Sequence, residues 1–339
     1  MTMTVRQLKS LVSTFLANRI LSVSMTGLML IALMLQGCDT PPPPLKVGTN
    51  IWPGYESLYI ARHKNFLDAE KVTLVEKINA TQVLRAFKSG QIDVAAQTMD
   101  EALSLMASHK SLRVIAVMDF SQGADVLIAK PEIRSLSDLE GRTLVVEKTA
   151  VGAIMLQGAL EAAGLDSYQI VVRNAVVNQH PDLWQDKDIA GVVTFDPYKS
   201  LLEARGGHVI FDSSETPRRI MDVLVVSAET AEQRPEQLKH LLSAHFKALD
   251  YMAENRAESG RVMSKRLKIP PSQVWRSFDG LHIPDLQETR TLLGGGGSKA
   301  FAEQIALLKQ LMLKADLIRQ DIEITDDFLT DRFLPGDKE

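Results

Sequence analysis

From residue 46 onward, short apolar runs rich in β-branched residues alternate with segments whose apolar positions repeat every three or four residues. The apolar runs predict strands, at 46–51, 72–78, 92–96, 112–118, 143–147, 169–173, 189–194, 208–211 and 222–227. The periodic segments predict helices between them, at 55–66, 81–88, 101–108 and 152–163. Because strands that alternate with helices form parallel sheets covered on both faces, the pattern predicts an α/β fold.

Beyond residue 227 the pattern is mostly helical. Pro235 suits the first turn of a helix, and two apolar stripes follow at helical spacing. The stripes consist of Leu238, Leu241, Leu242, His245, Leu249 and Met252, and of Phe301, Ile305, Leu308, Met312 and Ala315. We expect this helical part to pack on the first sheet. The four glycines at 294–297 predict a mobile loop, to which we assign no chemistry.

The first 37 residues have a different pattern. Three basic residues precede an uncharged apolar run over 20–35, and no acidic residue occurs before Asp39. This order is typical of a secretory signal, and the run is marginal for a membrane-spanning helix, which needs about 20 residues. The run ends in Leu-Gln-Gly-Cys, which resembles a bacterial lipobox and implies cleavage before Cys38 and acylation of that cysteine. The alternative is an uncleaved N-terminal anchor in which the cysteine occurs by chance.

Residues 38–45 are expected to tether the domain to a membrane. An aspartate directly after the lipidated cysteine resembles the inner-membrane retention signal of Gram-negative lipoproteins, and the four prolines at 41–44 predict a short, stiff spacer. We therefore expect a protein anchored through Cys38 at the periplasmic face of the inner membrane. The alternative interpretation of Asp39 is a random polar residue in the tether.

Charge and cysteine content exclude several classes of protein. The chain has a formal charge of −4. Without residues 1–37, which contain three of its basic residues, 35 basic residues stand against 42 acidic ones, a charge near −7. Proteins that bind nucleic acid carry basic faces, so nucleic acid is not an expected partner. Cys38 is the only cysteine, which excludes an internal disulfide and a cysteine-rich metal or redox site.

Candidate ligand-binding residues follow the predicted strands, because ligands of open α/β sheets bind outside the carboxyl ends of the strands. They are Trp52, Tyr55, Thr98, Asp100, Asp119, Thr149, Phe195, Asp196 and Asp222. The first two can stack on a ligand and donate hydrogen bonds to it, or they can cap the sheet. Each carboxylate can instead be a helix N-cap or an ion-pair partner.

The charge of the ligand follows from the same residues. Several carboxylates in one cleft favour a cation. The helix that starts at 149–152 offers free backbone N–H groups, which favour an anion. A zwitterionic ligand satisfies both, so we expect a cationic or zwitterionic ligand rather than an anionic one.

The sequence also lacks several motifs that mark cofactors and catalysis. It contains no G-x-G-x-x-G or P-loop motif, so no nucleotide cofactor is expected. None of its seven histidines has the spacing of metal ligands, and no G-x-S-x-G motif marks a nucleophile. We therefore expect no cofactor, no metal site and no enzymatic activity.

Several segments together resemble the periplasmic substrate-binding proteins of ABC transporters for nitrate, sulfonates, taurine and thiamine precursors. They are 47–56 (VGTNIWPGYE), 58–62 (LYIAR), 83–87 (VLRAF), 90–95 (GQIDVA), 123–125 (GAD), 137–142 (SDLEGR) and 192–197 (VVTFDP). The resemblance spans about 46–227 and implies two α/β lobes with hinge crossings near 123–139 and 222–227. About 300 residues also exceed what one hydrophobic core usually supports. Lobe I would comprise 46–125 and 223–339, and lobe II 126–222.

The resemblance implies a monomeric, lipid-anchored solute-binding protein that delivers a small polar molecule to an ABC permease by ligand-induced lobe closure. A receptor for a membrane signalling protein is the alternative, because both functions need the same closure. Relatives that are enzymes form a thiamine precursor and share a cysteine-rich motif, which this chain lacks.

Overall fold

The computed structural model describes residues 42–108, 111–216 and 220–336. The chain divides into two compact units, Met1–Pro43 and Pro44–Glu339, and the fold described below is that of the second. The predicted signal peptide, Cys38 and Asp39 lie outside the described residues. Within the part that the structure describes, no helix is both long and apolar enough to cross a membrane.

The first sheet has six strands in the order β11-β4-β10-β3-β1-β2. Their bounds are β1 Leu45–Thr49, β2 Val72–Glu76, β3 Val94–Thr98, β4 Leu112–Ser121, β10 Met221–Ser227 and β11 Leu281–His282. Strand β1 is parallel to β2 and β3, whereas β10 is antiparallel to both β3 and β4. The prediction of an α/β fold is confirmed, but the sheet is mixed, because β10 re-enters it from the second sheet in the opposite direction.

The second sheet has five strands in the order β7-β6-β8-β5-β9. Their bounds are β5 Val126–Ala129, β6 Thr143–Val146, β7 Val171–Asn174, β8 Ile189–Thr194 and β9 His208–Asp212. Strand β6 is parallel to β7 and β8, and β5 is antiparallel to β8 and β9. Strand β5 was not predicted from the sequence, and neither was the two-residue strand β11 of the first sheet; β5 forms by pairing with β8 and β9.

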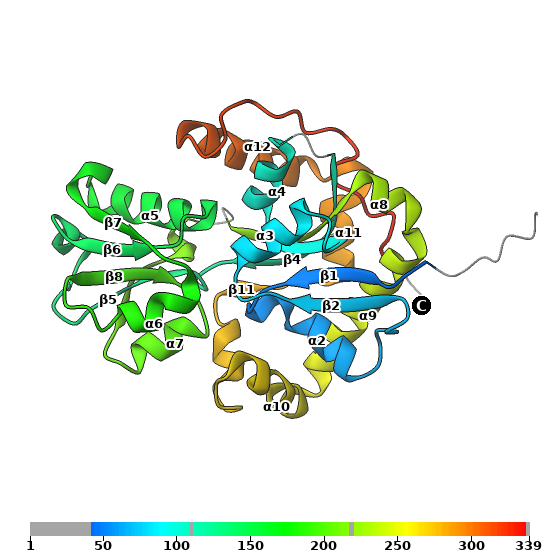
Figure 1. Cartoon of the computed structure of the whole chain (residues 1–339), viewed down its shortest axis with the longest axis horizontal. Helices are drawn as coiled ribbons and strands as arrows, with labels where there is room; N and C mark the ends of the chain where they lie inside the picture. The colour runs from blue at the N-terminus through cyan, green and yellow to red at the C-terminus, as the bar shows by residue number, and fades with distance from the viewer. Residues whose placement is uncertain (1–41, 109–110, 217–219, 337–339) are drawn as a thin grey trace, which may run out of the picture. The chain divides into compact units, whose positions relative to one another are not determined.

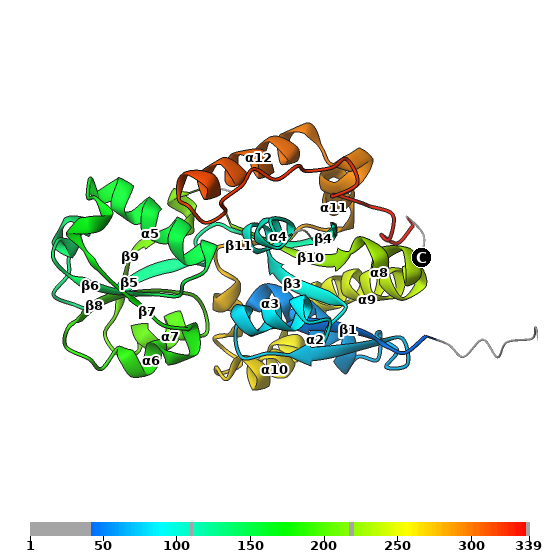
Figure 2. The ribbon, with the colours of Figure 1, turned by 45° about the horizontal axis from the view of Figure 1, so that its top comes forward.

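Helices cover both faces of each sheet (Figures 1 and 2). On the first sheet, α3 Ala80–Lys88 and α4 Met99–Met106 lie on one face, and α2 Glu56–His63, α9 Pro235–Glu254 and α10 Arg256–Leu267 on the other. On the second sheet, α5 Ala150–Ala163 lies opposite α6 His180–Leu183 and α7 Tyr198–Glu203. The remaining helices are α8 Ala228–Gln233, α11 Leu286–Leu293 and α12 Lys299–Lys314. The apolar stripe of α9 is buried against α2 and the sheet.

Two details of the helical C-terminal part differ from the sequence pattern. In the second stripe, Phe301, Ile305, Leu308 and Met312 are buried, but Ala315 lies past the end of α12 and is exposed. The four-glycine segment forms a short 3-10 turn over Gly294–Gly296, and Ser298 then caps α12 by accepting a hydrogen bond from the Phe301 N–H. The turn requires glycine at Gly297, which has a φ of 101° and on which a Cβ would lie 2.3 Å from Leu329.

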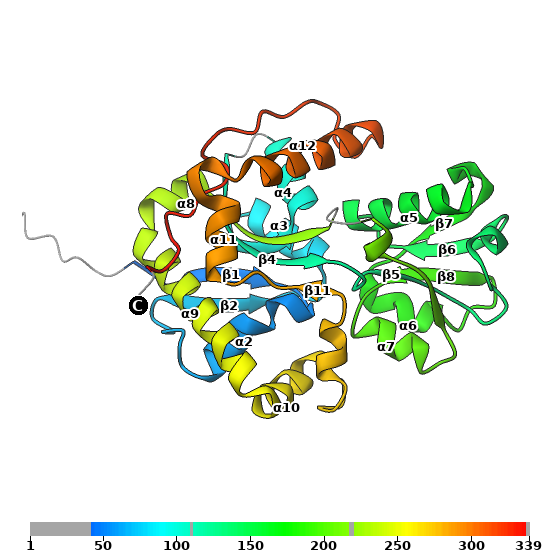
Figure 3. The same ribbon diagram turned by 180° about the vertical axis from the view of Figure 1, so that it is seen from behind.

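The chain crosses between the sheets twice, from β4 to β5 and from β9 to β10. Strands β4 and β10 pair along the length of β10 in the first sheet, where Figure 2 labels both of them, and Figure 3 shows the same sheet from behind. The crossings are joined by side-chain hydroxyls, since Ser121 at the end of β4 and Ser213 after β9 lie 2.7 Å apart, Oγ to Oγ. The residues at these crossings and at the neighbouring strand ends form the pocket described next.

Candidate functional site

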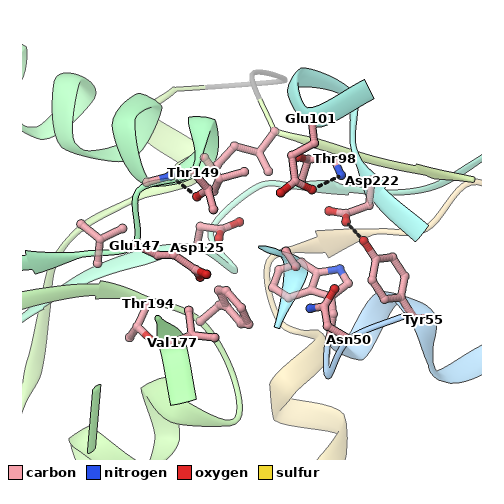
Figure 4. Close-up of a pocket in the computed structure, with 17 residues that line it drawn as sticks. Asn50, Tyr55, Thr98, Glu101, Asp125, Glu147, Thr149, Val177, Thr194 and Asp222 are labelled. Carbon is pink, nitrogen blue, oxygen red and sulfur yellow. Dashed lines mark hydrogen bonds between the residues drawn. The ribbon is translucent and has the colours of Figure 1, made fainter. Parts of the chain in front are cut away.

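A pocket lies where the strand ends and crossings of the two sheets meet, with a cavity volume of about 60 Å³ (Figure 4). From the first sheet and its helices it is lined by Asn50, Trp52, Tyr55, Ala80, Thr98, Glu101, Ile220 and Asp222. From the second sheet, its helices and the crossing it is lined by Asp125, Glu147, Thr149, Val151, Gly152, Val177, Val193, Thr194 and Phe195. Both halves of the fold therefore contribute to one site.

Aromatic side chains form one wall of the pocket. The rings of Trp52 and Phe195 meet edge to face, with centroids 5.0 Å apart and planes at 87°. The Trp52 indole N–H donates a 2.9 Å hydrogen bond to Asp119, and the Tyr55 hydroxyl donates one to Asp222. Both acceptors lie on the strands that cross between the sheets, β4 and β10. The aromatic wall is thus hydrogen-bonded to the crossing strands through the indole N–H and the phenol O–H.

A tight turn after β1 places this wall. The Tyr55 N–H donates to the Trp52 carbonyl at 3.1 Å, which closes the 3-10 turn Pro53–Tyr55. Gly54 in this turn has no room for a side chain, because a Cβ there would lie 1.7 Å from an Asp119 oxygen.

An arginine from α10 holds the residues before the turn. The Arg266 guanidinium donates to the Asn50 carbonyl at 2.6 Å and to Glu76 at 2.8 Å, pairs with the buried Glu56, and stacks on the Tyr59 ring at 3.6 Å. These contacts orient the backbone that leads into the pocket wall.

Two threonines line the pocket at the starts of helices. Thr149 caps α5, and its hydroxyl accepts a 3.2 Å hydrogen bond from the Gly152 N–H. One of the backbone donors that sequence reasoning assigned to an anion is therefore already satisfied by a side chain. Thr98 precedes α4, and its N–H donates to Glu101 at 3.3 Å. This contact turns the Glu101 side chain back toward the helix start and into the pocket (Figure 4).

Four carboxylates line the pocket, and burial raises the pKa of each of them. The pKa rises to about 8 for Glu101, where the nearby Asp100 charge adds to the effect of burial, and to about 7 for Asp125. For Asp222, burial and then the charge of Asp119 raise the pKa well above its ordinary value, and burial raises the pKa of Glu147. Among the described lining residues none is basic. Buried carboxyl groups without a counter-charge hold protons or attract a cation.

Six of the nine sequence-predicted residues line this pocket: Trp52, Tyr55, Thr98, Thr149, Phe195 and Asp222. The other three carboxylates are buried beside it. Asp119 accepts from Trp52, Asp196 accepts a 3.0 Å hydrogen bond from the Ser200 N–H in α7, and Asp100 lies in the first turn of α4, where burial raises its pKa to about 6. Asp196 thus has the capping role that the sequence offered as its alternative.

Five polar lining residues were not among the nine predicted ones: Asn50, Glu101, Asp125, Glu147 and Thr194. Four of them, all but Asp125, stand at or within three residues of the end of a strand, so their position at strand ends could have identified them. Asp125 could have been found as part of the Gly123-Ala124-Asp125 segment at the crossing.

Two hydrogen bonds connect the two halves of the fold beside the pocket. The Thr81 hydroxyl in α3 donates to Glu147, after β6, at 3.3 Å. The amide of Asn79, which precedes α3, donates to Asn178 at 3.3 Å. Both bonds join helix α3 of the first sheet to loops of the second.

Comparison with known proteins gives the family. The model of the NMT1-like family matches residues 39–268, more than half of the chain. The chain belongs to the NMT1-like family. A search of curated proteins finds no match to the sequence.

Solved structures show which fold this NMT1-like protein shares. The alkanesulfonate-binding protein SsuA from Xanthomonas axonopodis pv. citri, bound to MOPS, is 16% identical with a TM-score of 0.70, over 86% of this chain and 98% of that one. The periplasmic aliphatic sulphonate-binding protein SsuA from Escherichia coli is 18% identical with a TM-score of 0.71, over 88% and 96%. The desulfurization enzyme DSZB is 15% identical with a TM-score of 0.63, over 86% and 98%. The expected resemblance to periplasmic substrate-binding proteins and their fold is confirmed, and an enzyme shares that fold.

The NMT1-like protein has a second, larger hollow away from the strand ends. This groove, of about 650 Å³, is lined by α9, the 3-10 turn Val274–Phe278 and α11, with Trp275 at its side. The Trp275 ring is covered by the Arg256 guanidinium at 4.0 Å. None of the sequence-predicted ligand residues lines the groove. Across the described ranges, no three His, Cys, Asp or Glu side chains are grouped to hold a metal ion.

Proposed function

We propose that this protein is a lipid-anchored periplasmic solute-binding protein that delivers a small polar molecule to an ABC importer. The observation that carries the proposal is the pocket at the strand ends, whose lining comes from both halves of the fold. A ligand there contacts both halves at once, so its binding favours the arrangement in which they are closed. Lobe I would comprise 46–125 and 223–339, and lobe II 126–222.

The composition of the pocket supports a binding role rather than catalysis. Its described lining contains no cysteine, serine, lysine or histidine, the side chains that most often serve as nucleophiles or general bases. Of its three threonines, Thr194 has a histidine beside it, with His180 Nδ1 at 3.2 Å from its hydroxyl, but burial lowers the pKa of that histidine to about 4, which makes it a weak base at neutral pH. We therefore propose no enzymatic activity, although DSZB shares the fold.

The charge of the lining supports a cationic or zwitterionic solute. The two SsuA proteins are sulfonate binders by name, yet the pocket here presents four carboxylates. A sulfonate in this pocket would face carboxyl groups whose pKa burial already raises. A cation would instead supply the missing counter-charge.

The anchor and the partner are part of the same proposal. Acylation of Cys38 would hold the protein at the periplasmic face of the inner membrane, where an ABC permease could receive the solute from a single copy of the chain. More than one acyl chain gives stable anchoring, whereas a single chain binds membranes only marginally. Metabolic labelling with palmitate tests the anchor: label that persists in Cys38→Ser would contradict it.

A thermal-shift screen tests the binding role. Residues 44–339, which form one compact unit, would be heated with amines, amino acids, sulfonates, nitrate and pyrimidines. A solute at 100 times its Kd stabilises the folded protein by about 2.7 kcal/mol, which raises Tm by several degrees. Stabilisation by at least one amine or zwitterion is expected. If no member of any class raises Tm, the solute-binding role is contradicted.

A further inference from the structure

The crossing between the sheets brings an unusual group of acidic side chains together around the pocket. Asp125, in the loop between β4 and β5, is only 3% exposed and lines the pocket directly. One of its carboxylate oxygens has no hydrogen-bond partner among the described residues. Leaving a buried, charged acceptor unpaired is costly, and in native structures such a group calls for a specific explanation.

The backbone around Asp125 is held by hydrogen bonds, which fixes the point from which its side chain enters the pocket. The Asp125 N–H donates to the Ser121 hydroxyl at 3.1 Å, and its carbonyl accepts from the Ser213 N–H at 2.9 Å. The Ser213 hydroxyl also accepts from the Gly123 N–H at 2.7 Å. The loop is thus fixed on both sides of Asp125. In Figure 4 its carboxylate lies among the lining residues, between Thr149 and Glu147.

The groups that surround Asp125 are themselves acidic. They are Asp100 on α4, Asp119 on β4 and Asp222 on β10, whose charges interact with that of Asp125, and Glu101 and Glu147, which line the same pocket. Asp119 and Asp222 stand opposite one another on paired strands. Asp125 raises the pKa of both, which means that their charges interact. No described lysine, arginine or histidine lines the pocket beside them. Residues 217–219, which include Arg218 and Arg219, lie outside the described part of the chain.

We propose that Asp125, flanked by Glu101 and Asp222, is the subsite that receives the ammonium group of an amine. The apolar body of this amine would lie against Trp52 and Phe195 on the opposite wall. The inference rests on the proposed solute-binding function and names the charge and position of the group that is bound. An ammonium group donates up to three hydrogen bonds, which suits a free carboxylate oxygen with two more carboxyl groups beside it.

Binding of an amine should release protons from the pocket to solvent. The arriving cation favours the ionised carboxylates, so protons that the empty pocket holds are released to solvent as the ammonium enters. With a pKa of about 7 for Asp125, at least about 0.5 proton should leave per amine bound at pH 7, and more if Glu101 or Asp222, whose pKa values burial also raises, ionises with it. Binding of a neutral molecule has no such requirement.

Three probes that share a phenyl ring and differ in charge test the inference: benzylamine, benzyl alcohol and benzenesulfonate. Calorimetric titration of residues 44–339 with each probe should show the tightest binding for benzylamine. In Asp125→Asn, benzylamine affinity should fall about 10- to 150-fold, the range for losing a hydrogen bond to a charged group. The matched control is Asp196→Asn, since Asp196 is also buried but caps α7 and does not line the pocket. This variant should change the affinity less than twofold.

A second measurement needs no variant. Titrations of the wild-type protein with benzylamine in two buffers of different ionisation enthalpy give the number of protons released, which should be at least about 0.5 at pH 7. Release of no proton, unchanged affinity in Asp125→Asn, tighter binding of benzenesulfonate, or no benzylamine binding at 10 mM would each overturn the cation subsite. These results leave the solute-binding role standing whenever another solute raises Tm in the screen, so the two failures are distinguishable.

Discussion

Replacing Asp125 with asparagine should make the ligand-free protein more stable, and the gain should grow with pH. Burial raises the pKa of Asp125 from 3.8 to about 7. A carboxyl group whose pKa is higher in the folded than in the unfolded chain binds protons more tightly when folded. Its protonation therefore stabilises the fold at low pH, and this stabilisation is lost as pH rises from about 4 through about 7. Asparagine does not titrate and avoids the loss.

The magnitude follows from the two pKa values. Relative to wild type, Asp125→Asn should gain about 1 kcal/mol at pH 4.5 and about 4 kcal/mol at pH 8. Removing the Asp125 charge also relieves Asp119 and Asp222, whose pKa values it raises, so the direction is reinforced. For a chain of this size the gain at pH 8 corresponds to a rise in Tm on the order of 5–10 °C.

Differential scanning fluorimetry at the two pH values measures this effect. The exposed Asp188→Asn is the control for the loss of one acidic residue and should shift Tm by about 1 °C or less at either pH. An Asp125→Asn protein whose Tm differs from wild type by the same amount at pH 4.5 and pH 8 would refute the reasoning. A gain in stability together with a loss of amine binding would mark Asp125 as a residue kept for function at the expense of stability.

Three further predictions concern the contacts around the pocket. Gly54→Ala should push Asp119 off the Trp52 indole, because its Cβ would lie 1.7 Å from an Asp119 oxygen; solute affinity should fall at least tenfold, and an unaltered Kd would contradict this. Arg266→Met should lower the free energy of unfolding by about 3–5 kcal/mol, since it leaves buried Glu56 without its ion-pair partner. Urea titration measures this free energy, and a loss below about 1 kcal/mol would contradict the prediction. Thr81→Val removes the donor that reaches Glu147 across the pocket and should weaken solute binding about fivefold. The Tm of the ligand-free variant should stay within about 2 °C of wild type. A solute affinity equal to that of wild type would show that this hydrogen bond does not favour closure.

Much of the fold could be predicted from the sequence because its strands and helices have different hydrophobic periods. The strand 189–194 and the helix start at 149–152 illustrate this, since both depend on local pattern alone. Strand β5 could not be predicted, because its four apolar residues become a strand only by pairing with β8 and β9. The direction of β10 likewise depends on where the chain re-enters the first sheet.

The candidate site, like the fold, could be predicted only in part from the sequence. Strand ends could be located, so six of the nine predicted residues line the pocket. Which of two neighbours faces the pocket could not be predicted: Glu101 lines it and Asp100 does not. Adjacent positions on a helix point about 100° apart, and a one-residue error in the start of α4 exchanges them. Asp125 is not at a strand end, and its position depends on how the crossing loop is held by Ser121 and Ser213.

The most direct test of the proposed function asks whether the solute binds at Trp52. The chain has three tryptophans: Trp52 lines the pocket, Trp275 lines the separate groove, and Trp184 is buried in the second sheet's own core. In a protein that carries Trp184→Phe and Trp275→Phe, fluorescence reports on Trp52 alone. Titration with the solute that raises Tm most should change this emission saturably, with the Kd found by calorimetry. A solute that stabilises the protein but leaves Trp52 emission unchanged would contradict the assignment of the binding site.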